Sequence, residues 1–292
     1  MVYKKTLGDR IFNAANFIFM ILIMLIMVYP CWYVLMASFS DPVAIYGNGG
    51  ILLWPKHFGI YTYQEVLKNS QVWLGYRNTV LYVACGGLLS LFLTISAAFC
   101  LTRRGLPGRN GILFLILFTM YFSGGLIPSY LVVRSLKLLD TPFAVLLPGA
   151  VSTYNLIITI TYFRGLPYEL EEAAKIDGAG DYTVLFRVMV PLATPIIAVI
   201  ALYYMVGIWN NYFTPMLYLN KRSLFPLQLF LREILIQNNT ASITASQSDS
   251  AQAYAENVKY AIIVVSTVPV MCIYPFLQRY FVKGIMIGAI KE

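Results

Sequence analysis

Charged residues are scarce in this 292-residue sequence, making up 12% of the chain, while 59% of the residues are hydrophobic. Soluble domains carry about 25% charged residues, so the composition excludes an ordinary soluble fold. The formal net charge is nevertheless +8, from 21 Lys and Arg residues against 13 Asp and Glu residues. No dense basic cluster is interleaved with aromatic residues, so we expect no nucleic-acid partner.

Residues that commonly bind metals are also few. His57 is the only histidine, which excludes a histidine-based metal cluster. The four cysteines, Cys31, Cys85, Cys100 and Cys272, form no CxxC pair and fall in hydrophobic stretches. Free cysteines in such stretches pack as small, buried hydrophobic residues. We therefore predict no disulfide, no metal site and no cofactor.

Sequence signatures of catalysis are missing as well. No G-x-x-x-x-G-K-[ST] is present, so the chain cannot hold ATP phosphates in a Walker A loop. An intramembrane enzyme is disfavoured because neither an H-E-x-x-H motif nor a His/Asp pair is found. Ser123-Gly124-Gly125 superficially matches an ATPase signature, but it lies in a hydrophobic run. Small residues there favour close helix packing or a bend. We expect no catalytic residues and no enzyme activity.

Long hydrophobic windows dominate what is present. A membrane-spanning helix needs roughly 20 mostly apolar residues. Six windows between charged residues meet or nearly meet that length: Ile11–Ser40, Asn78–Thr102, Asn110–Val133, Thr141–Phe163, Val188–Asn220 and Tyr260–Gln278. The first is too long for the apolar region of a signal peptide, which spans about 7–15 residues. We predict an all-α integral membrane protein with six transmembrane helices, the first of them uncleaved.

The placement of Lys and Arg predicts the orientation. Six spans put both termini on one side of the membrane. If that side is the cytoplasm, 12 of the 21 basic residues lie inside and 9 outside, which is the bias expected of cytoplasmic loops. The short loop 102–109 carries the clearest signal, with Arg103, Arg104 and Arg109. We therefore expect both termini and the segment 164–187 to be cytoplasmic.

That segment is unusually charged, with eight charges in 24 residues between hydrophobic windows. It predicts two short helices joined by a bend, with Pro167 at the first helical position. The residues expected on one face of the first helix are spaced i, i+3, i+4 and i+7: Leu170, Ala173, Ala174 and Asp177. Gly178 is expected to end this helix in a left-handed conformation. Asp181 is expected to cap the next helix, which would run toward the membrane.

The charged segment also resembles the EAA motif of ABC importer permeases. The matching residues are Glu172-Ala173-Ala174, Asp177-Gly178-Ala179, Val188 and Pro191. Residues 278–291 (QRYFVKGIMIGAIK) resemble the ending of the carbohydrate-uptake branch, whose maltose-type permeases are familiar members. The resemblance implies the type I (MetI-like) ABC importer permease fold. It further implies a permease subunit of an importer for sugars or oligosaccharides that forms half of the translocation pore.

The resemblance implies specific partners and residue roles. An ATPase-coupling role is carried over to Glu172, Ala173, Ala174, Asp177, Gly178, Ala179 and Pro191. The implied partners are a homologous second permease chain, two cytoplasmic ATPase chains, an extracellular solute-binding protein, an oligosaccharide and membrane lipid. The implied location is the bacterial cytoplasmic membrane. An ABC permease for amino acids or peptides remains an alternative. An ion-coupled secondary transporter is a second alternative, disfavoured because the six windows contain no carboxylate.

Two polar stretches inside the windows are candidates for a substrate path. Tyr154 and Asn155 lie near the middle of the fourth window, where polar groups face a bundle interior or an aqueous path. Hydrogen bonding between helices is the competing interpretation. Trp209, Asn210, Asn211 and Tyr212 resemble the WN-x-[FY] stretch of sugar permeases, and the alternative for them is a simple interface cluster. In the maltose type only one of the two permease chains holds the sugar.

The remaining segments suggest the division of the chain. Residues 1–77 are expected to hold the first span and an extracellular loop with a short helix near Tyr63–Asn69. Residues 78–280 are expected to form the five-helix core with the coupling loop 164–187, and 281–292 a cytoplasmic tail. The polar residues 237–253 predict a flexible loop. By resemblance, this loop would reach the solute-binding protein.

Overall fold

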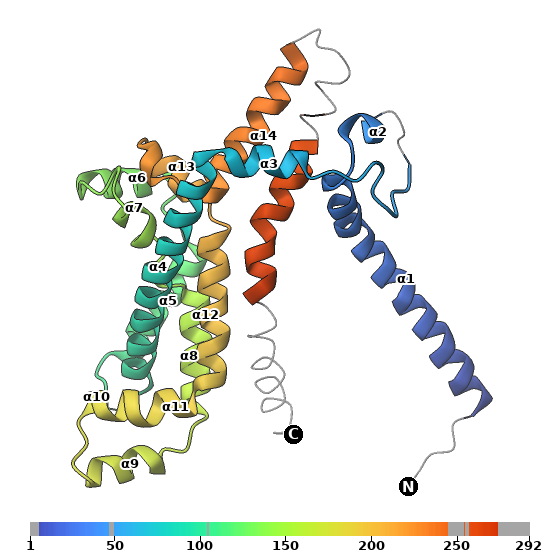
Figure 1. The fold of residues 1–292 in the computed structure, drawn as a ribbon. Coiled ribbons are helices and arrows are strands. Elements are labelled where there is room, and N and C mark those ends of the chain that lie inside the picture. Colours follow the sequence, from blue (N-terminus) through green and yellow to red (C-terminus); the bar gives the residue numbers. More distant parts are fainter. Residues whose placement is uncertain (1–5, 47–49, 104, 245–253, 255–256, 274–292) are drawn as a thin grey trace. The chain divides into compact units, whose positions relative to one another are not determined.

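The computed structural model describes residues 6–46, 50–103, 105–244, 254 and 257–273 (Figure 1). The described residues form helices and no strand. Two compact units are formed, each from two chain segments: Met1–Asn69 with Ile234–Val268, and Ser70–Glu233 with Pro269–Glu292. The predicted all-α class is confirmed for the described part of the chain.

The first unit begins with α1 (Leu7–Ser38), a 32-residue helix. Thr6 and Asp9 form a capping box at its start, in which the Asp9 N–H donates to the Thr6 hydroxyl (3.3 Å). Only Ala37 and Ser38 of α1 are buried, so its apolar side chains face outward. Outward apolar surface over this length is typical of a helix that crosses lipid.

A single buried amide joins the other parts of this unit. The short helices α2 (Pro42–Tyr46) and α3 (Tyr61–Lys68) follow α1, and α3 confirms the helix expected near Tyr63–Asn69. Asn257, at the start of the helix Asn257–Ile273, donates to the carbonyls of Ala37 (3.1 Å) and Ser40 (3.0 Å). Its side-chain oxygen accepts from the Thr62 hydroxyl (2.8 Å). The amide is thereby satisfied by three groups from two segments that are distant from it in sequence.

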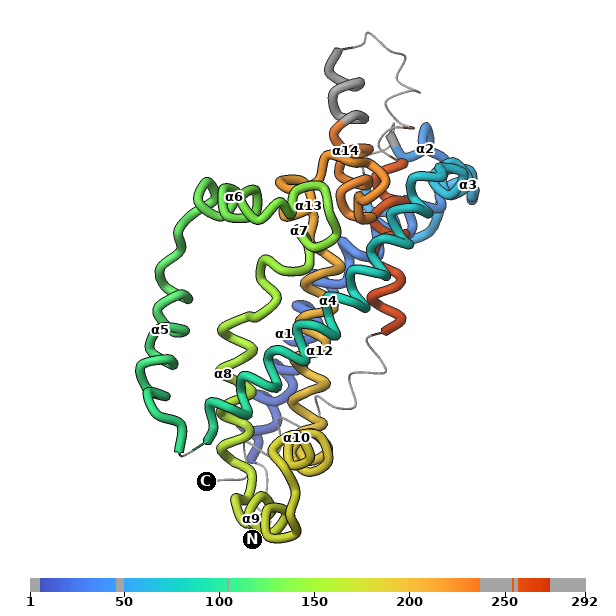
Figure 2. Tube along the Cα trace, turned by 90° about the vertical axis from the view of Figure 1, so that its left-hand side faces the viewer, coloured from blue at the N-terminus to red at the C-terminus, as the bar shows by residue number. Residues whose placement is uncertain are grey.

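The second unit is built around α4 (Ser70–Thr102), a 33-residue helix. The helices α8 (Thr153–Arg164) and α12 (Thr194–Trp209) pack along it, as Figure 2 shows. Their buried side chains form one core, with Ala98 of α4, Leu156 and Ile160 of α8, and Ile200 of α12 at its centre. This core places the ends of the three helices next to one another.

The opposite end of α4 packs against the segment after α13 (Phe213–Tyr218). The Asn78 amide donates to the carbonyls of Ser223 (2.8 Å) and Phe225 (3.0 Å). The Leu227 N–H, at the start of α14 (Leu227–Thr244), donates to the Thr79 hydroxyl (2.8 Å). Neighbouring polar residues of α4 therefore satisfy backbone groups that no helix pairs.

Two hydrophobic windows are bent rather than straight. The helices α5 (Arg109–Tyr121) and α6 (Leu126–Ser135) meet at 118° at the break that contains Ser123-Gly124-Gly125. The run Asp181–Leu192 meets α12 at 88°, next to Pro191 and Pro195. The bend, one of the two roles predicted for the small residues, is confirmed at the glycine pair. The second bend lies beside two prolines, each of which lacks a backbone N–H.

The predicted count of six spans is not confirmed. In the described part of the chain, two helices are long and apolar enough to cross a membrane, or up to four if each bent pair is one span. The fourth window is broken at Pro148-Gly149 between α7 (Phe143–Leu146) and α8. The last described helix, Asn257–Ile273, begins three residues before the expected window. It belongs to the shorter apolar helices of 10–17 residues. Window length alone does not predict these interruptions.

Three further expectations need correction or fall outside the described residues. The prediction of a flexible loop over residues 237–253 is wrong for residues 237–244, because α14 continues as a helix to Thr244. All four cysteines are free as expected, but they are exposed rather than buried, because many apolar side chains of these helices face outward. The predicted tail 281–292 and the matching residues 278–291 lie outside the described part.

Candidate functional site

The charged segment 164–187 folds into a helical hairpin at the end of the second unit (Figure 1). Its first arm is α9 (Glu169–Ile176). Its second arm runs through α10 (Asp181–Thr183), a π-helical turn (Val184–Met189) and α11 (Val190–Leu192). Gly178 adopts φ +83° between the arms, as the sequence predicted, a conformation that costs residues with a Cβ atom.

Both predicted helix starts in this hairpin are wrong. The N–H groups of Glu171 and Glu172 donate to the Tyr168 carbonyl, so Tyr168 is the N-cap and Pro167 precedes it. Gly180 is the N-cap of α10, and Asp181 is already its first helical residue. Asp181 does not cap the helix because its carboxylate pairs with Arg103 instead.

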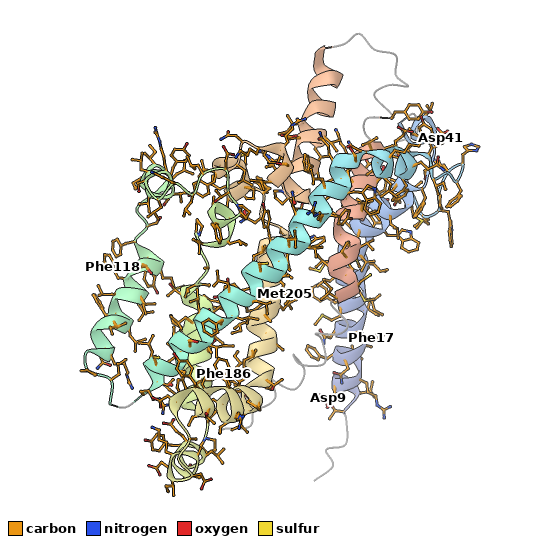
Figure 3. The ribbon with its side chains drawn as sticks, turned by 60° about the vertical axis from the view of Figure 1, so that its left-hand side comes forward. Asp9, Phe17, Asp41, Phe118, Phe186 and Met205 are labelled. Atoms are coloured by element: carbon orange, nitrogen blue, oxygen red, sulfur yellow. The ribbon has the colours of Figure 1, made fainter. Side chains whose placement is uncertain are left out.

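The second arm was expected to run toward the membrane. The 88° angle between Asp181–Leu192 and α12 shows that the arm crosses the end of the bundle before the chain turns into α12. Pro191 lies in the last turn of the arm, and Ala193 at the break is fully buried. Phe186, labelled in Figure 3, lies on this arm. Its ring is nearly parallel to that of Phe92 of α4, with ring centroids 6.4 Å apart.

The face of α9 expected from the i, i+3, i+4 and i+7 spacing is mostly exposed. Of its four members, only Ala174 packs against the core, together with Ala179 after the bend. Glu172 and Ala173 are exposed, and the Ile176 residue is 86% exposed. Glu171 is the buried residue of α9, so the two adjacent glutamates differ in burial.

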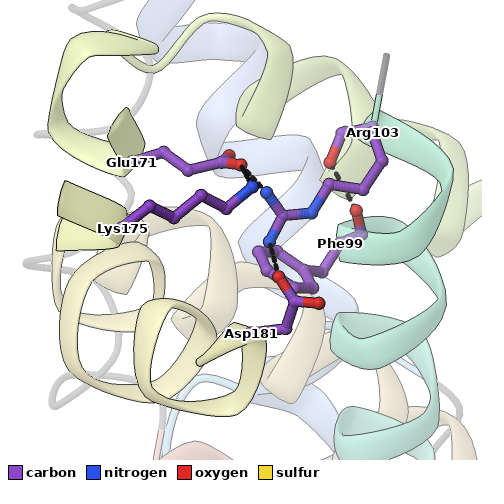
Figure 4. A network of polar contacts seen from close by, with 6 residues as sticks. Phe99, Arg103, Glu171, Lys175 and Asp181 are labelled. Atoms are coloured by element: carbon purple, nitrogen blue, oxygen red, sulfur yellow. Dashed lines mark hydrogen bonds and ion pairs between the residues drawn. The ribbon is translucent and has the colours of Figure 1, made fainter. Parts of the chain in front are cut away.

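Glu171 is buried because a cation lies beneath it. Arg103 follows the last residue of α4, and its guanidinium pairs with Glu171 through one nitrogen and with Asp181 through the other (3.0 Å), as Figure 4 shows. Lys175 also contacts Glu171 (3.0 Å). The guanidinium carbon lies 3.9 Å from the centroid of the Phe99 ring. One planar side chain therefore joins α4 to both arms of the hairpin.

A cavity of about 560 Å³ adjoins this ion-pair network. Basic groups outnumber acidic ones along its wall, because Arg103, Arg109, Arg164 and Lys175 face Glu171 and Asp181. Sequence reasoning missed the Arg103–Glu171 pair. The two residues are 68 positions apart, and no spacing rule connects them.

A second cavity, of about 530 Å³, lies between α4, α8 and α12. Tyr154, Asn155 and Asn211 from the predicted substrate path line it, together with Tyr203 and Tyr204. Tyr154 and Asn155 lie in the first turn of α8, after the N-cap Ser152, and not in the middle of a continuous span as predicted. The break at Pro148-Gly149 creates this helix start.

The four residues from Trp209 to Tyr212, at the end of α12, have different surroundings. Trp209 is buried, and its ring centroid lies 6.2 Å from that of Tyr76. Asn210 is exposed, and Tyr212 contacts the Arg232 guanidinium at 5.2 Å. Only Asn211 of the four lines the second cavity. The four residues therefore do not form one compact cluster.

A bundle of apolar helices with a charged helical hairpin at one end defines the class of membrane transport permeases. The chain belongs to the family described as "Binding-protein-dependent transport system inner membrane component", whose model matches residues 72–287. Its members are permease subunits of ABC transporters, so the chain is a membrane component and not an enzyme. The membership confirms the resemblance to ABC importer permeases.

Relatives and a solved structure match nearly the whole chain. Protein LplC of Bacillus subtilis (strain 168) is 38% identical over 98% of this chain and 97% of its own. The polygalacturonan/rhamnogalacturonan transport system permease protein YtcP of the same strain is 39% identical, over 97% and 99%. A crystal structure of a bacterial ABC transporter involved in the import of the acidic polysaccharide alginate matches with a TM-score of 0.84 and 33% identity, covering 96% of this chain and 100% of that one.

Proposed function

We propose that this chain forms half of the translocation pore of an ABC importer for oligosaccharides. One relative named above is a polygalacturonan/rhamnogalacturonan transport system permease, and the solved structure is of a transporter involved in alginate import, which supports this substrate class. The second cavity supports it independently. Among the described residues that line it, hydroxyl, amide and aromatic groups are present and charged side chains are absent. Such groups bind sugar hydroxyls and ring faces.

The observation that carries the proposal is the outward face of α9. Glu172 and Ala173 are exposed there, beside the largely exposed side chain of Ile176. An anionic group beside a highly exposed apolar side chain is typical of a docking surface rather than of a solvated loop. We assign this surface to a cytoplasmic ATPase.

The remaining coupling residues then have distinct tasks. Ala173 lets the ATPase approach the helix backbone closely, while Ala174 and Ala179 hold α9 against the permease core. Asp177 and Gly178 form the bend, and Pro191 lies where the second arm turns into α12. Closure of two ATPase chains on ATP would move two such hairpins together. The helices above would rock as bodies and open the pore alternately to each side.

The assembly extends the same proposal. A homologous second permease chain completes the pore, two ATPase chains bind in the cytoplasm, and an extracellular solute-binding protein delivers the oligosaccharide. α5 has no buried residue in this chain, and Phe114, Phe118 and Tyr121 are exposed on it. A surface of this kind needs lipid or a second permease chain to cover it. Six spans in the bacterial cytoplasmic membrane, with both termini cytoplasmic, complete the arrangement.

The substrate path passes through the second cavity in this proposal. Tyr154, Asn155 and Asn211 contribute its lining, and Asn210 and Tyr212 are surface positions beside it in the sequence. Trp209 is buried against Tyr76 and would support the path without contacting sugar. The proposed substrate-path role is therefore best supported for Tyr154, Asn155 and Asn211, which line the cavity.

Uptake by the purified assembly tests the proposed function. The tagged chain would be purified with the ATPase and second permease that accompany it and reconstituted in liposomes with the solute-binding protein. We expect uptake of labelled oligogalacturonate to require ATP and the solute-binding protein. Labelled tripeptides serve as the matched comparison. Uptake of peptides but not oligosaccharides, or uptake that persists without ATP, would contradict the proposal.

A further inference from the structure

The hairpin is covalently joined to the core at both ends, through residues 165–168 from α8 into α9 and through its second arm into α12. The second of these connections contains an 88° turn, with fully buried Ala193 at the break between two prolines. Neither connection runs through α4, the longest helix of the unit, which packs on the second arm through apolar side chains. A contact between α4 and α9 itself would make these two helices move together.

Arg103 has the geometry of such a connection. Its N–H donates to the Cys100 carbonyl (3.2 Å), so its backbone continues the last turn of α4. Its guanidinium packs on the Phe99 ring of the same helix, with 3.9 Å between the guanidinium carbon and the ring centroid. The side chain is thus held against α4 before it reaches the hairpin. The Arg103 guanidinium is therefore fixed relative to α4.

The pairing on the hairpin side is shielded from water. The Arg103 side chain is 19% exposed and the Glu171 side chain is 10% exposed, whereas Asp181 and Lys175 face solvent more fully. Solvent and salt screen exposed ion pairs strongly but buried pairs much less. The Arg103–Glu171 contact is therefore the strong part of the network, and Asp181 adds a second contact on the other arm.

The far end of this connection is the substrate cavity. α4 packs along α8 and α12, and its Ser90 lines the second cavity. The Thr94 hydroxyl lies 2.7 Å from the Tyr204 hydroxyl, which also accepts from the Ser152 N–H (3.0 Å). Tyr204 and Ser152 line the same cavity. A displacement of α4 therefore reaches groups on both other walls.

We infer that Arg103 and Glu171 are a positioning pair that makes α4 move with the ATPase-coupling helix, so that ATP hydrolysis is converted into movement at the substrate cavity. This rests on the proposed docking of α9 on an ATPase. The two adjacent glutamates then have different roles. Glu172 holds the ATPase on the outer face, and Glu171 transmits its movement on the inner face.

The test measures transport and ATP hydrolysis separately in reconstituted assemblies carrying Arg103→Gln, Glu171→Gln or both changes. We expect hydrolysis stimulated by the solute-binding protein to continue, while oligosaccharide transported per ATP falls about tenfold, a typical effect of breaking a coupling contact. The double variant should be no worse than either single variant, because each residue acts through the other. Arg103→Lys should recover part of the ratio, since lysine keeps the charge but lacks the planar fork.

Arg109→Gln is the matched control. Arg109 lines the same cavity and carries the same charge, but it makes no ion pair among the described residues. Its ratio of transport to hydrolysis should equal that of the unmodified chain. An unchanged ratio in Arg103→Gln and Glu171→Gln would overturn the inference. Equal loss of hydrolysis and transport would also overturn it, because the pair would then support docking or folding. If Arg103→Gln fails to insert, Arg103→Lys decides by the same ratio.

The two proposals fail in different ways. Absence of ATP-dependent uptake by the unmodified assembly contradicts the proposed function. Normal uptake by the unmodified assembly, with an unchanged ratio in the variants, contradicts only the positioning role of the pair.

Discussion

At the scale of the residue, neighbours of the same type do different things in this chain. Glu171 and Glu172 are adjacent in α9, but Glu171 is buried on Arg103 and Glu172 is exposed. The reason is the 100° that separates consecutive positions on a helix, combined with a cation on only one side. The EAA-type pattern identifies the exposed glutamate, and only the packed structure identifies the buried one.

Glu172→Lys should abolish transport without affecting membrane insertion. Reversing an exposed charge at a docking surface typically costs roughly 2 kcal/mol of binding, or about 30-fold in affinity. Ala173→Trp should have a similar effect, because its bulk would keep the ATPase from the helix backbone. Copurification of the ATPase with the tagged chain measures both. Glu169→Lys, with the same charge change in the exposed first turn of α9, is the control. Full ATPase recovery with both variants would contradict docking on this face.

Asp140 provides a prediction about pH outside the membrane-spanning helices. Its backbone has φ +57°, and its carboxylate accepts from the backbone N–H groups of Asn220 and Lys221. The hydrogen bond from Asn220 is the main reason that the pKa of Asp140 lies below its usual value. A lowered pKa in the folded state means that the charge stabilises the fold above the unfolded-state pKa. This stabilisation is lost as the pH falls through the folded-state pKa.

Asp140→Asn should therefore lower thermal stability at neutral pH, and the difference should shrink as the pH falls below about 4. Asparagine tolerates the positive φ and keeps one acceptor oxygen, so the change isolates the charge. Unfolding of the detergent-solubilised chain, followed from pH 7 to pH 3, measures the difference. A difference that stays constant over this range would show that the charge is not responsible.

At the scale of the element, close approach between helices decides which small residues matter. A Cβ atom on Gly75 of α4 would lie 2.9 Å from the Leu227 Cα and 2.9 Å from the Phe230 ring. On Gly87, in the same helix, it would make an ordinary contact of 3.7 Å with Met205. The backbone of α14 cannot move away as a flexible side chain can. Gly75 therefore sets how near α4 and the start of α14 lie to each other.

Gly75→Ala should destabilise the second unit by about 1–3 kcal/mol, the usual cost of overpacking. Gly87→Ala should stabilise the unit by about 0.5–1 kcal/mol, because alanine is the better helix former and its Cβ meets only an adaptable methionine. Both changes raise helix propensity equally, so the pair separates packing from propensity. Thermal unfolding of the purified variants compares them, and equal stabilities would disprove the close contact.

Bends are the other feature of elements that shapes this protein. Small residues at Ser123-Gly124-Gly125 indicated one break from the sequence, and the prolines at 191 and 195 lie at the other. The sequence did not indicate their angles of 118° and 88°. Glycine weakens the preference of the backbone for helix, and proline removes one helix hydrogen bond, so both favour a break at their own position. The direction in which the chain continues depends on the helices against which the next segment packs.

At the scale of the whole molecule, orientation in the membrane is the property to test. In the proposed arrangement the loop that contains Trp54 is extracellular and the α9 hairpin is cytoplasmic. Trp54 and Ile176 are both highly exposed, so a cysteine at either site should react readily once a reagent reaches it. The four native cysteines are free and exposed and must first be replaced by alanine.

Trp54→Cys should react with a membrane-impermeant maleimide in intact cells, and Ile176→Cys only after the cells are permeabilised. Labelling of the tagged chain, measured by a mass shift on a gel, compares the two sites. Reaction of Ile176→Cys in intact cells would place α9 outside, where no cytoplasmic ATPase reaches it. That result would contradict both the orientation and the coupling role.

The sequence by itself determined the class of this protein. Few charges and long apolar windows predict an all-α membrane protein, because a helix satisfies its own backbone hydrogen bonds in lipid. The permease class followed from the resemblance of the charged insert to the EAA motif. Gly178 indicated the bend between the two arms of the hairpin, and the small residues 123–125 indicated the bend between α5 and α6. Only the tertiary structure decided that Arg103 joins α4 to the hairpin, that Glu171 is the buried residue of α9, and that Tyr154 and Asn155 begin a helix. Local patterns report helix period and polarity, whereas these features depend on contacts between residues far apart in the chain.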